Sequence, residues 1–311
     1  MDVVVQIFIS ALAFLVALFP AFGTSLVYIA GPIQPLSPHA RILFGGDMMF
    51  DRSIRTTMQE QGDGFVFSCL VDTFRNHDLI VANLEGPITD HSSVSVGSSV
   101  GGPDNFTFTF PTSTARLLHL EGITLVNIGN NHIMNYSREG LMQTYQWLRM
   151  NEVDTFGGPD LSESDKVDRR SINGVPFSFV NWSDWTSDKT DHTVAQVTLE
   201  AEAGRVVVVY THWGDEYVAP PERVKQLARS FVDAGASIVI GSHPHIVQEH
   251  EFYKGKYIYY SLGNLIFDQY WNDAVSHGLM LDVAFSRTGV ESVKEIPVEL
   301  GRDRRTCPVQ P

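Results

Sequence analysis

Short runs of β-branched and aliphatic residues recur along this chain and alternate with longer stretches that mix apolar and polar positions at helical spacing. The apolar runs are typical of strands buried on both faces and lie at residues 41–44, 79–82, 124–128, 205–210 and 237–240. The stretches with helical spacing lie near residues 52–61, 67–75, 113–121, 137–150 and 221–234. This alternation in both halves of the chain predicts an α/β domain with helices outside its sheets.

Turn residues predict where the remaining strands pair. Asn173-Gly174 lies between two short runs, which is typical of a β-hairpin, and Lys254-Gly255 closes a second hairpin over residues 246–260. Further strands are expected near residues 279–285 and 290–298. Residues 91–103 are rich in Ser, Gly and Val without a helical period and predict a loop.

The first 40 residues follow another pattern. No Asp, Glu, Lys or Arg occurs from Val3 to Ala40, and the run to Ala30 is long enough to cross a hydrocarbon core of roughly 30 Å. We favour a single-pass membrane anchor at residues 1–30, a proline-containing linker at 31–40 and a soluble domain on the extracytoplasmic side. The alternative is cleavage after Gly23, which would release a secreted domain.

Each of the five buried runs is followed by a side chain that can bind a metal. These side chains are Asp47, Glu85, Asn131, His132, His212, His243 and His245. Open α/β sheets bind ligands beyond the carboxyl ends of their strands, so we expect the set to converge. His243 and His245 are two residues apart, and in an extended segment they would point the same way. Oxygen and imidazole donors without a thiolate favour Zn, Mn or Fe over a structural zinc finger.

Charge and cysteine content narrow the classes of function. The formal net charge of −14 and the pI near 5.1 argue against broad binding to nucleic acid or to an anionic membrane surface. The two cysteines, Cys69 and Cys307, form no Cys-x-x-Cys pair, which disfavours a thiolate zinc site and leaves a single disulfide open. With 311 residues, one domain of catalytic size is expected at 41–300, followed by a basic, frayed tail at 301–311.

Several motifs together resemble the capsule-synthesis CapA family, a branch of the calcineurin-like metallophosphatases. The resemblance runs from about residue 41 to 285, and its motifs are Gly46-Asp47-Met48-Met49-Phe50-Asp51-Arg52, Asn83-Leu84-Glu85-Gly86-Pro87, Gly129-Asn130-Asn131-His132, His212-Trp213-Gly214-Asp215-Glu216-Tyr217, Gly241-Ser242-His243-Pro244-His245 and Tyr260-Ser261-Leu262-Gly263-Asn264. It implies a two-sheet αββα sandwich with a metal centre at the strand ends.

The resemblance also implies roles for the candidate ligands. Asp47 and His245 would hold one metal, Glu85 would bridge, and the second metal would be held by Asn131, His212 and His243. His132 matches the general acid of phosphatase relatives, and Arg52 would contact a phosphate oxygen, although an ordinary ion pair is the alternative. Met49 stands where those relatives have a histidine, and a thioether is a poor ligand for such ions, so one or two ions are expected.

Two functions follow from the resemblance. The first is an accessory role, at the membrane, in the synthesis or export of an anionic polymer such as poly-γ-glutamate, alongside a membrane-bound polymer synthase complex. The alternative is a metal-dependent phosphoesterase acting on a phosphate ester. In either case Trp213, Tyr217, Tyr270 and Trp271 would wall the cleft or simply pack in the core.

Overall fold

The computed structural model describes residues 39–162, 165–186 and 189–309. The proposed anchor and nearly all of the linker lie outside the described residues. Among the described residues, no helix combines the length and apolarity needed to cross a membrane.

One sheet has eight strands in the order β14-β13-β12-β1-β2-β3-β4, with β11 paired beside β1. Its strands are β1 (His39–Met48), β2 (Leu79–Leu84), β3 (Ile123–Asn127), β4 (Asp154–Phe156), β11 (Asn264–Ile266), β12 (His277–Ser286), β13 (Gly289–Leu300) and β14 (Thr306–Pro308). The neighbours β1, β2, β3 and β4 are parallel, so their carboxyl ends meet at one edge.

The other sheet has six strands in the order β5-β6-β7-β8-β10-β9. Its strands are β5 (Asp168–Ile172), β6 (Val175–Ser183), β7 (Val206–His212), β8 (Ile238–Ser242), β9 (His250–Tyr253) and β10 (Lys256–Tyr259). β6, β7 and β8 are parallel, and the hairpin at Asn173-Gly174 is confirmed as the antiparallel pair β5 and β6.

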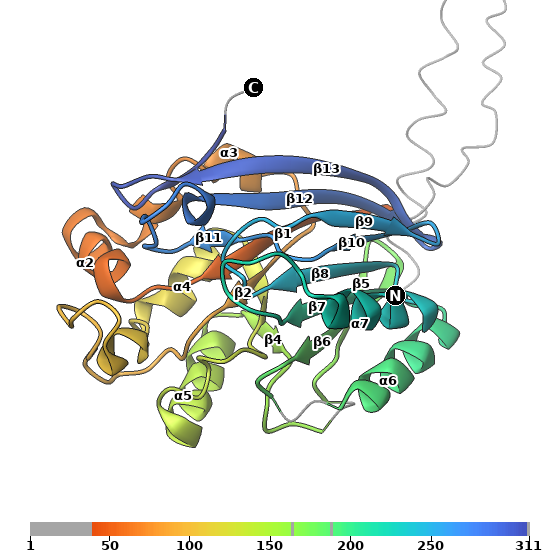
Figure 1. The fold of residues 1–311 in the computed structure, drawn as a ribbon, viewed down its shortest axis with the longest axis horizontal. Coiled ribbons are helices and arrows are strands. Elements are labelled where there is room, and N and C mark those ends of the chain that lie inside the picture. Colours follow the sequence, from red (N-terminus) through yellow and green to blue (C-terminus); the bar gives the residue numbers. More distant parts are fainter. Residues whose placement is uncertain (1–38, 163–164, 187–188, 310–311) are drawn as a thin grey trace, which may run out of the picture. The chain divides into compact units, whose positions relative to one another are not determined.

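Helices cover both outer faces, with α2, α4 and α5 on one side of the sheets and α6 and α7 on the other (Figure 1). The helices are α2 (Arg52–Gln61), α3 (Val71–Phe74), α4 (Ser113–Leu120), α5 (Ser137–Met150), α6 (Thr190–Glu202) and α7 (Glu222–Asp233), with short 3₁₀ turns at Asp63–Phe67, Pro103–Phe106 and Ala274–Ser276. The sequence did not predict α6.

Three buried layers confirm the predicted αββα sandwich. Val206 and Val208 of β7 pack between the two sheets, whereas Val207 and Val209 pack against α6 and α7. Because successive side chains of a strand point to opposite faces, a run of four valines requires apolar material on both sides. The pattern that identified the strand therefore also fixed its place between two layers.

The prediction of a frayed C-terminal tail is wrong. β14 pairs with β13 from Val298 to Leu300, and Cys307 forms a disulfide with Cys69. The tail is thus tied to the body of the domain through backbone hydrogen bonds and a covalent link, neither of which a local basic pattern reveals.

Candidate metal centre

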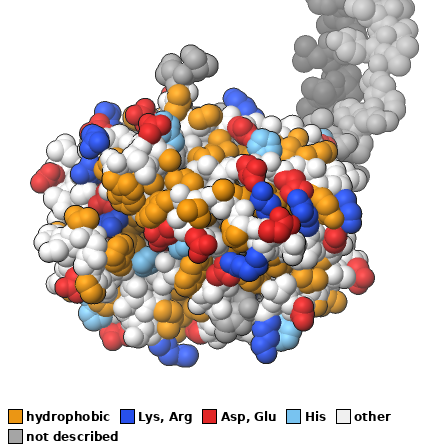
Figure 2. Space-filling view, in the orientation of Figure 1, with side chains coloured by type: hydrophobic (Ala, Val, Ile, Leu, Met, Phe, Trp, Pro, Cys, Tyr) orange, Lys and Arg blue, Asp and Glu red, His pale blue; other side chains and the backbone are white. Residues whose placement is uncertain are grey.

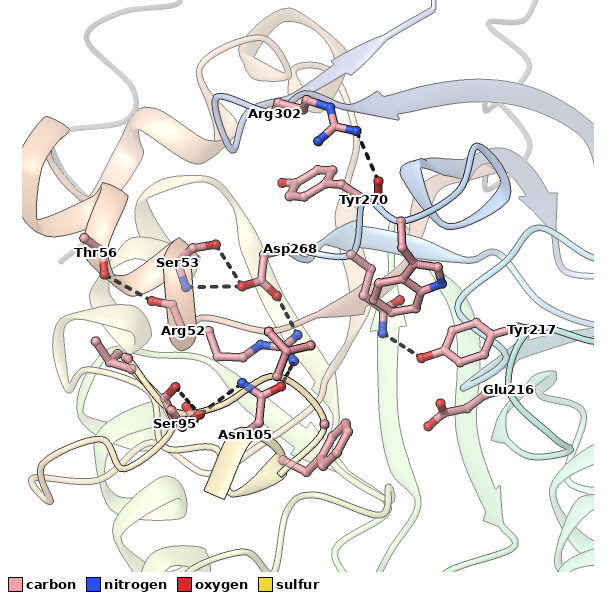
Figure 3. Close-up of a pocket in the computed structure, with 18 residues that line it drawn as sticks. Arg52, Ser53, Thr56, Ser95, Asn105, Glu216, Tyr217, Asp268, Tyr270 and Arg302 are labelled. Carbon is pink, nitrogen blue, oxygen red and sulfur yellow. Dashed lines mark hydrogen bonds and ion pairs between the residues drawn. The ribbon is translucent and has the colours of Figure 1, made fainter. Parts of the chain in front are cut away.

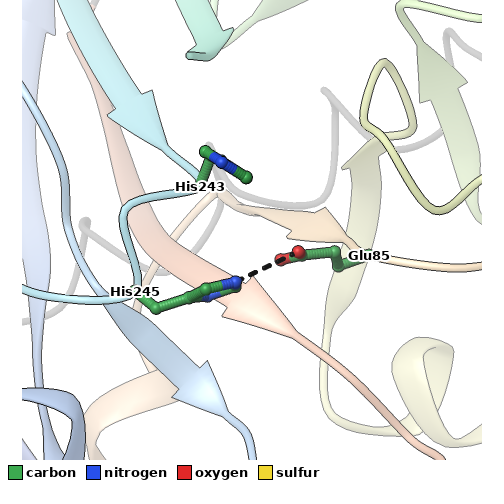
Figure 4. A group of neighbouring side chains, drawn as sticks. All are labelled: Glu85, His243 and His245. Carbon is green, nitrogen blue, oxygen red and sulfur yellow. Dashed lines mark ion pairs between the residues drawn. The ribbon is translucent and has the colours of Figure 1, made fainter. Parts of the chain in front are cut away.

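The predicted ligands converge at the carboxyl ends of the parallel strands. Asp47 is the penultimate residue of β1, His212 ends β7, Glu85 follows β2, and His243 and His245 follow β8; all five are at least 96% buried. Two overlapping groups, Glu85–His243–His245 and Asp47–Glu85–His212, each have ligand atoms within 4.8 Å of one another. Figure 4 shows His245 directed at Glu85, with His243 beside them. Both groups share Glu85, as a bridging ligand requires.

The two histidines around Pro244 do not converge in the way the sequence predicted. β8 ends at Ser242, and both His243 (φ 95°) and His245 (φ 57°) have left-handed backbone conformations. Such conformations are costly for residues other than glycine and are found mainly at functional sites. A tight turn after the strand, rather than strand alternation, therefore brings the two rings to a centroid distance of 5.8 Å.

Hydrogen bonds fix which nitrogen of His245 is free. The Nδ2 of Asn264 donates to the carbonyl of Val275 and to Gln269, so its Oδ1 is left to accept from His245 Nδ1 at 3.0 Å. Nδ1 therefore donates to Asn264, and the other ring nitrogen, Nε2, faces Glu85 Oε1 at 3.4 Å. A bound cation would be held between Nε2 and this carboxylate oxygen.

Neighbouring polar side chains also orient His212. Its Nδ1 lies 2.9 Å from Ser242 Oγ and 3.3 Å from Asn83 Nδ2. On the other side of the ring, His212 Nε2 is hydrogen-bonded to Asn131 Oδ1 at 2.8 Å. An ion bound there would replace this hydrogen bond, so the structure brings together two of the three side chains that the resemblance assigns to the second metal.

Asn83 holds the two carboxylates and was missed by the sequence analysis. Its Nδ2 donates to Asp47 Oδ1 at 2.8 Å and lies 3.5 Å from Glu85 Oε2. Its Oδ1 accepts from the amides of Asn127 and Asn130, which fixes the orientation of the side chain. Its place two residues before Glu85, on the same face of β2, was the available signal.

The site carries buried negative charge that no side chain balances fully. Burial, and next the neighbouring Asp47, raise the pKa of Glu85 well above its usual range. Glu85 Oε1 and His243 Nδ1 are buried without a hydrogen-bond partner among the described residues. Because unpaired buried polar atoms are costly, these observations show that the donor set fits a divalent cation.

Met49 does not join the ligands. Its sulfur accepts the backbone N–H of Asp51 at 2.9 Å, and its side chain packs in the core beneath the outer helices. The two groups of converging ligand atoms, Asp47–Glu85–His212 and Glu85–His243–His245, divide the histidines differently from the sets that the resemblance implies, in which His245 joins Asp47 and His212 joins His243.

The two predicted catalytic residues lie beside this centre. The His132 ring packs 4.3 Å from that of Phe108, and burial lowers the pKa of His132 to about 4, opposed in part by the hydrogen bond that His132 Nδ1 donates to Asn135 Oδ1. His132 is thus neutral near pH 7 and is not a charged proton donor there. Arg52 is ion-paired with Asp268 at 2.5 Å, and its contact with a phosphate oxygen stays a prediction.

A cleft of about 700 Å³ opens next to the metal centre. Tyr217, Tyr270 and Trp271 line it, as predicted (Figure 3). The Tyr217 ring lies 6.1 Å from that of His245. Trp213 does not line it, because its ring is fully buried and its Nε1 donates to the Tyr260 carbonyl. Acidic and basic side chains are interspersed over the face seen in Figure 2 rather than gathered into a basic patch.

Replacing Asn264 with alanine is expected to weaken divalent-metal binding by about 10- to 100-fold, because His245 loses the acceptor that orients its ring. Competition with a chromophoric chelator measures the affinity. Asn272→Ala is the matched control, since Asn272 accepts only from Val275 in the same loop. Equal affinities for the two variants would contradict the orienting role.

The chain is similar to one family model and to several known proteins. Residues 41–269 match the family model described as bacterial capsule synthesis protein PGA_cap. The chain is 31% identical, over 73% of its length, to the PGA biosynthesis protein CapA of Bacillus subtilis, 63% of which is covered. It is 28% identical over 73% to the capsule biosynthesis protein CapA of Bacillus anthracis, 59% of which is covered.

A more distant relative is a probable polyglutamine synthesis accessory protein of Mycobacterium tuberculosis, 28% identical over 61% of this chain and 56% of the relative. The chain therefore spans about six tenths of the length of the Bacillus relatives it matches.

Proposed function

The chain belongs to the bacterial capsule synthesis protein family PGA_cap, and we propose that it acts in the synthesis or export of an anionic capsule polymer of the poly-γ-glutamate type. The names of its Bacillus relatives support this role. The observation that carries the proposal is the buried donor set of Asp47, Glu85, His212, His243 and His245, which opens beside a cleft large enough for a polymer segment.

The donor set would hold one or two divalent ions, of Zn, Mn or Fe type. Bound there, such ions would attract and polarise carboxylate or phosphoryl oxygens of the ligand. Side chains of the protein hold these ligands in position. Asn83 spaces Asp47 and Glu85, and Asn264 orients His245. Trp185 packs 4.0 Å from His243 and shields that ring from water.

A deletion strain tests the proposal. Loss of the gene is expected to lower the amount or length of the acidic surface polymer, and wild-type protein is expected to restore it. Complementation with His245→Ala should fail because a ligand is lost, whereas His119→Ala, on the exposed face of α4, should restore the polymer. An unchanged polymer in the deletion strain would contradict the proposed role.

A second candidate function is hydrolysis of a phosphate ester at the same centre. Its support is the position of His132 and Arg52 beside the ligands, with the Arg52 guanidinium 5.1 Å from the Phe108 ring on which His132 packs. Metal-loaded protein would then cleave a generic phosphomonoester. His132→Ala would lower kcat by about 100-fold, provided that the negative charge of the bound phosphoryl group raises the pKa of His132 enough for it to donate a proton to the leaving oxygen. Absence of turnover, with metal bound, would leave the binding role alone.

We place the domain outside the cytoplasm, held by a single-pass anchor at residues 1–30 and next to a membrane-bound polymer synthase complex. The Cys69–Cys307 disulfide supports this location, because disulfides persist in oxidising compartments. Protein isolated from its host under thiol-blocking conditions should show no free thiol and should fractionate with membranes. Recovery in the cytosolic fraction with two free thiols would overturn this placement.

A further inference from the structure

The C-terminal segment builds a rigid turn at residues 301–305. Gly301 N–H donates to the Arg305 carbonyl at 2.7 Å, and Arg304 N–H donates to the Gly301 carbonyl at 2.8 Å. The chain that follows is fixed by the pairing of β14 with β13 and by the disulfide between Cys307 and Cys69. Thr306 Oγ1 adds a hydrogen bond to the Leu265 carbonyl at 2.5 Å.

This turn directs two arginines at one wall of the cleft. Arg302 lines the cleft and donates to the Tyr270 carbonyl at 3.2 Å (Figure 3). Arg304 lies behind it, with Nε donating to Ser53 Oγ at 2.8 Å. The guanidinium groups of Arg302 and Arg304 lie 6.0 and 4.8 Å from the centre of the Tyr270 ring, which holds that ring in place as part of the wall.

Within the described part of the chain, no carboxylate pairs with the guanidinium of Arg302. It forms no ion pair there, and its side chain is exposed, whereas the neighbouring Arg305 is paired with Asp303 at 2.7 Å. Of the acidic side chains that line the cleft, Asp268 is paired with Arg52, and Glu216 lies on the opposite side from Arg302 in Figure 3. A free guanidinium in a chain of net charge −14 is a local site for an anion.

We propose that Arg302 binds a carboxylate of the acidic polymer that occupies the cleft, while Tyr270 and Trp271 contact the apolar links between its charged groups. This inference rests on the proposed function and states which side chains would recognise the polymer outside the metal centre. The Cys69–Cys307 disulfide holds the turn, so reduction weakens this contact. The turn lies outside residues 41–269, the part that matches the family model, so that match assigns no role to Arg302.

The experiment measures binding of fluorescein-labelled oligo-γ-glutamate to the metal-loaded full chain by fluorescence anisotropy. Arg302→Gln is expected to raise Kd by about tenfold, since it removes one charge-assisted contact. Arg287→Gln, at the exposed hairpin between β12 and β13, is the matched control and should bind like wild type. Reduction of the disulfide should raise Kd by a similar factor while metal content stays constant.

The outcomes separate this inference from the proposed function. Metal-dependent binding that Arg302→Gln leaves unchanged overturns the subsite and leaves the proposed function standing. If wild-type protein binds no oligo-γ-glutamate, the polymer is not the ligand, and the same variants are then tested with 1-naphthyl phosphate. A loss of that binding in Arg302→Gln alone supports an oxyanion subsite for phosphate, whereas no binding, or no loss, overturns it.

Discussion

Replacing Glu85 with glutamine is expected to lower the affinity for divalent metal by more than about 100-fold and to remove both ions together. Glu85 is the residue shared by the two groups of converging ligand atoms, so its loss weakens each of them. A neutral amide cannot replace the charge that a bridging carboxylate supplies, and ligand losses exceed the roughly 10- to 100-fold effects seen for residues that only orient a ligand. Elemental analysis and chelator competition measure the change.

The same substitution should stabilise the protein when metal is absent. Glu85 is fully buried beside Asp47, and both burial and that neighbour raise its pKa, so above the ordinary carboxyl pKa the metal-free protein folds at the cost of protonating Glu85 or of burying its charge. An amide of the same shape removes this charge, and we expect a gain of about 1–2 kcal/mol, or roughly 3–6 °C in Tm. With saturating metal, the wild type is expected to be the more stable of the two proteins, because metal binding stabilises only the wild type.

Glu216→Gln is the matched control for this experiment. Glu216 contributes to the raised pKa of Glu85, yet it is exposed on the cleft wall and belongs to neither ligand group. It should change metal affinity by less than about threefold, as expected for a screened surface charge. If Glu85→Gln binds metal as tightly as Glu216→Gln does, the assignment of Glu85 as a shared ligand is wrong.

Removing the disulfide by the double change Cys69→Ser and Cys307→Ser is expected to lower the free energy of unfolding by up to roughly 5 kcal/mol. The bond closes a loop with a sequence separation of 238 residues, and cross-links that close long loops restrict the unfolded chain most. Urea unfolding of the variant and the oxidised wild type, monitored by circular dichroism, measures the difference.

Reduced wild type provides an independent comparison, because it loses the bond without a substitution. It should unfold near the same urea concentration as the double serine variant and well below the oxidised protein. If oxidised and reduced wild type unfold together, the bond does not form in solution, and both the stability of the C-terminal segment and its role in the cleft would need another explanation.

The sequence was most informative where a local pattern had only one consistent structural meaning. Four consecutive valines at Val206–Val209 require apolar layers on both sides of a strand, and the structure has both. The side chains that follow the parallel strands could be named in advance because such strands end at one edge of a sheet. The alternation of strands and helices predicted an α/β domain, whereas the αββα sandwich and the family were expected from the resemblance of the strand-end motifs to a known family.

The residues that support the ligands could not be identified in this way. Asn83 and Asn264 are ordinary asparagines in sequence, and only the register of β1 against β2 and β11 brings them to Asp47 and His245. Trp213 follows a ligand histidine but turns into the core. The direction in which a side chain points just after a strand depends on the turn that follows. His243 and His245 have left-handed backbone conformations, so the two-residue alternation of a strand does not predict where their side chains point.

By itself, then, the amino-acid order determined the layers of this protein and the donor atoms at its strand ends, because period and residue type act over a few neighbouring positions. Only the tertiary structure decided that Cys69 meets Cys307 and that Arg302 faces the cleft. The disulfide joins residues 238 positions apart and Arg302 contacts Tyr270 32 positions away, so both depend on packing around the whole domain rather than on any local pattern.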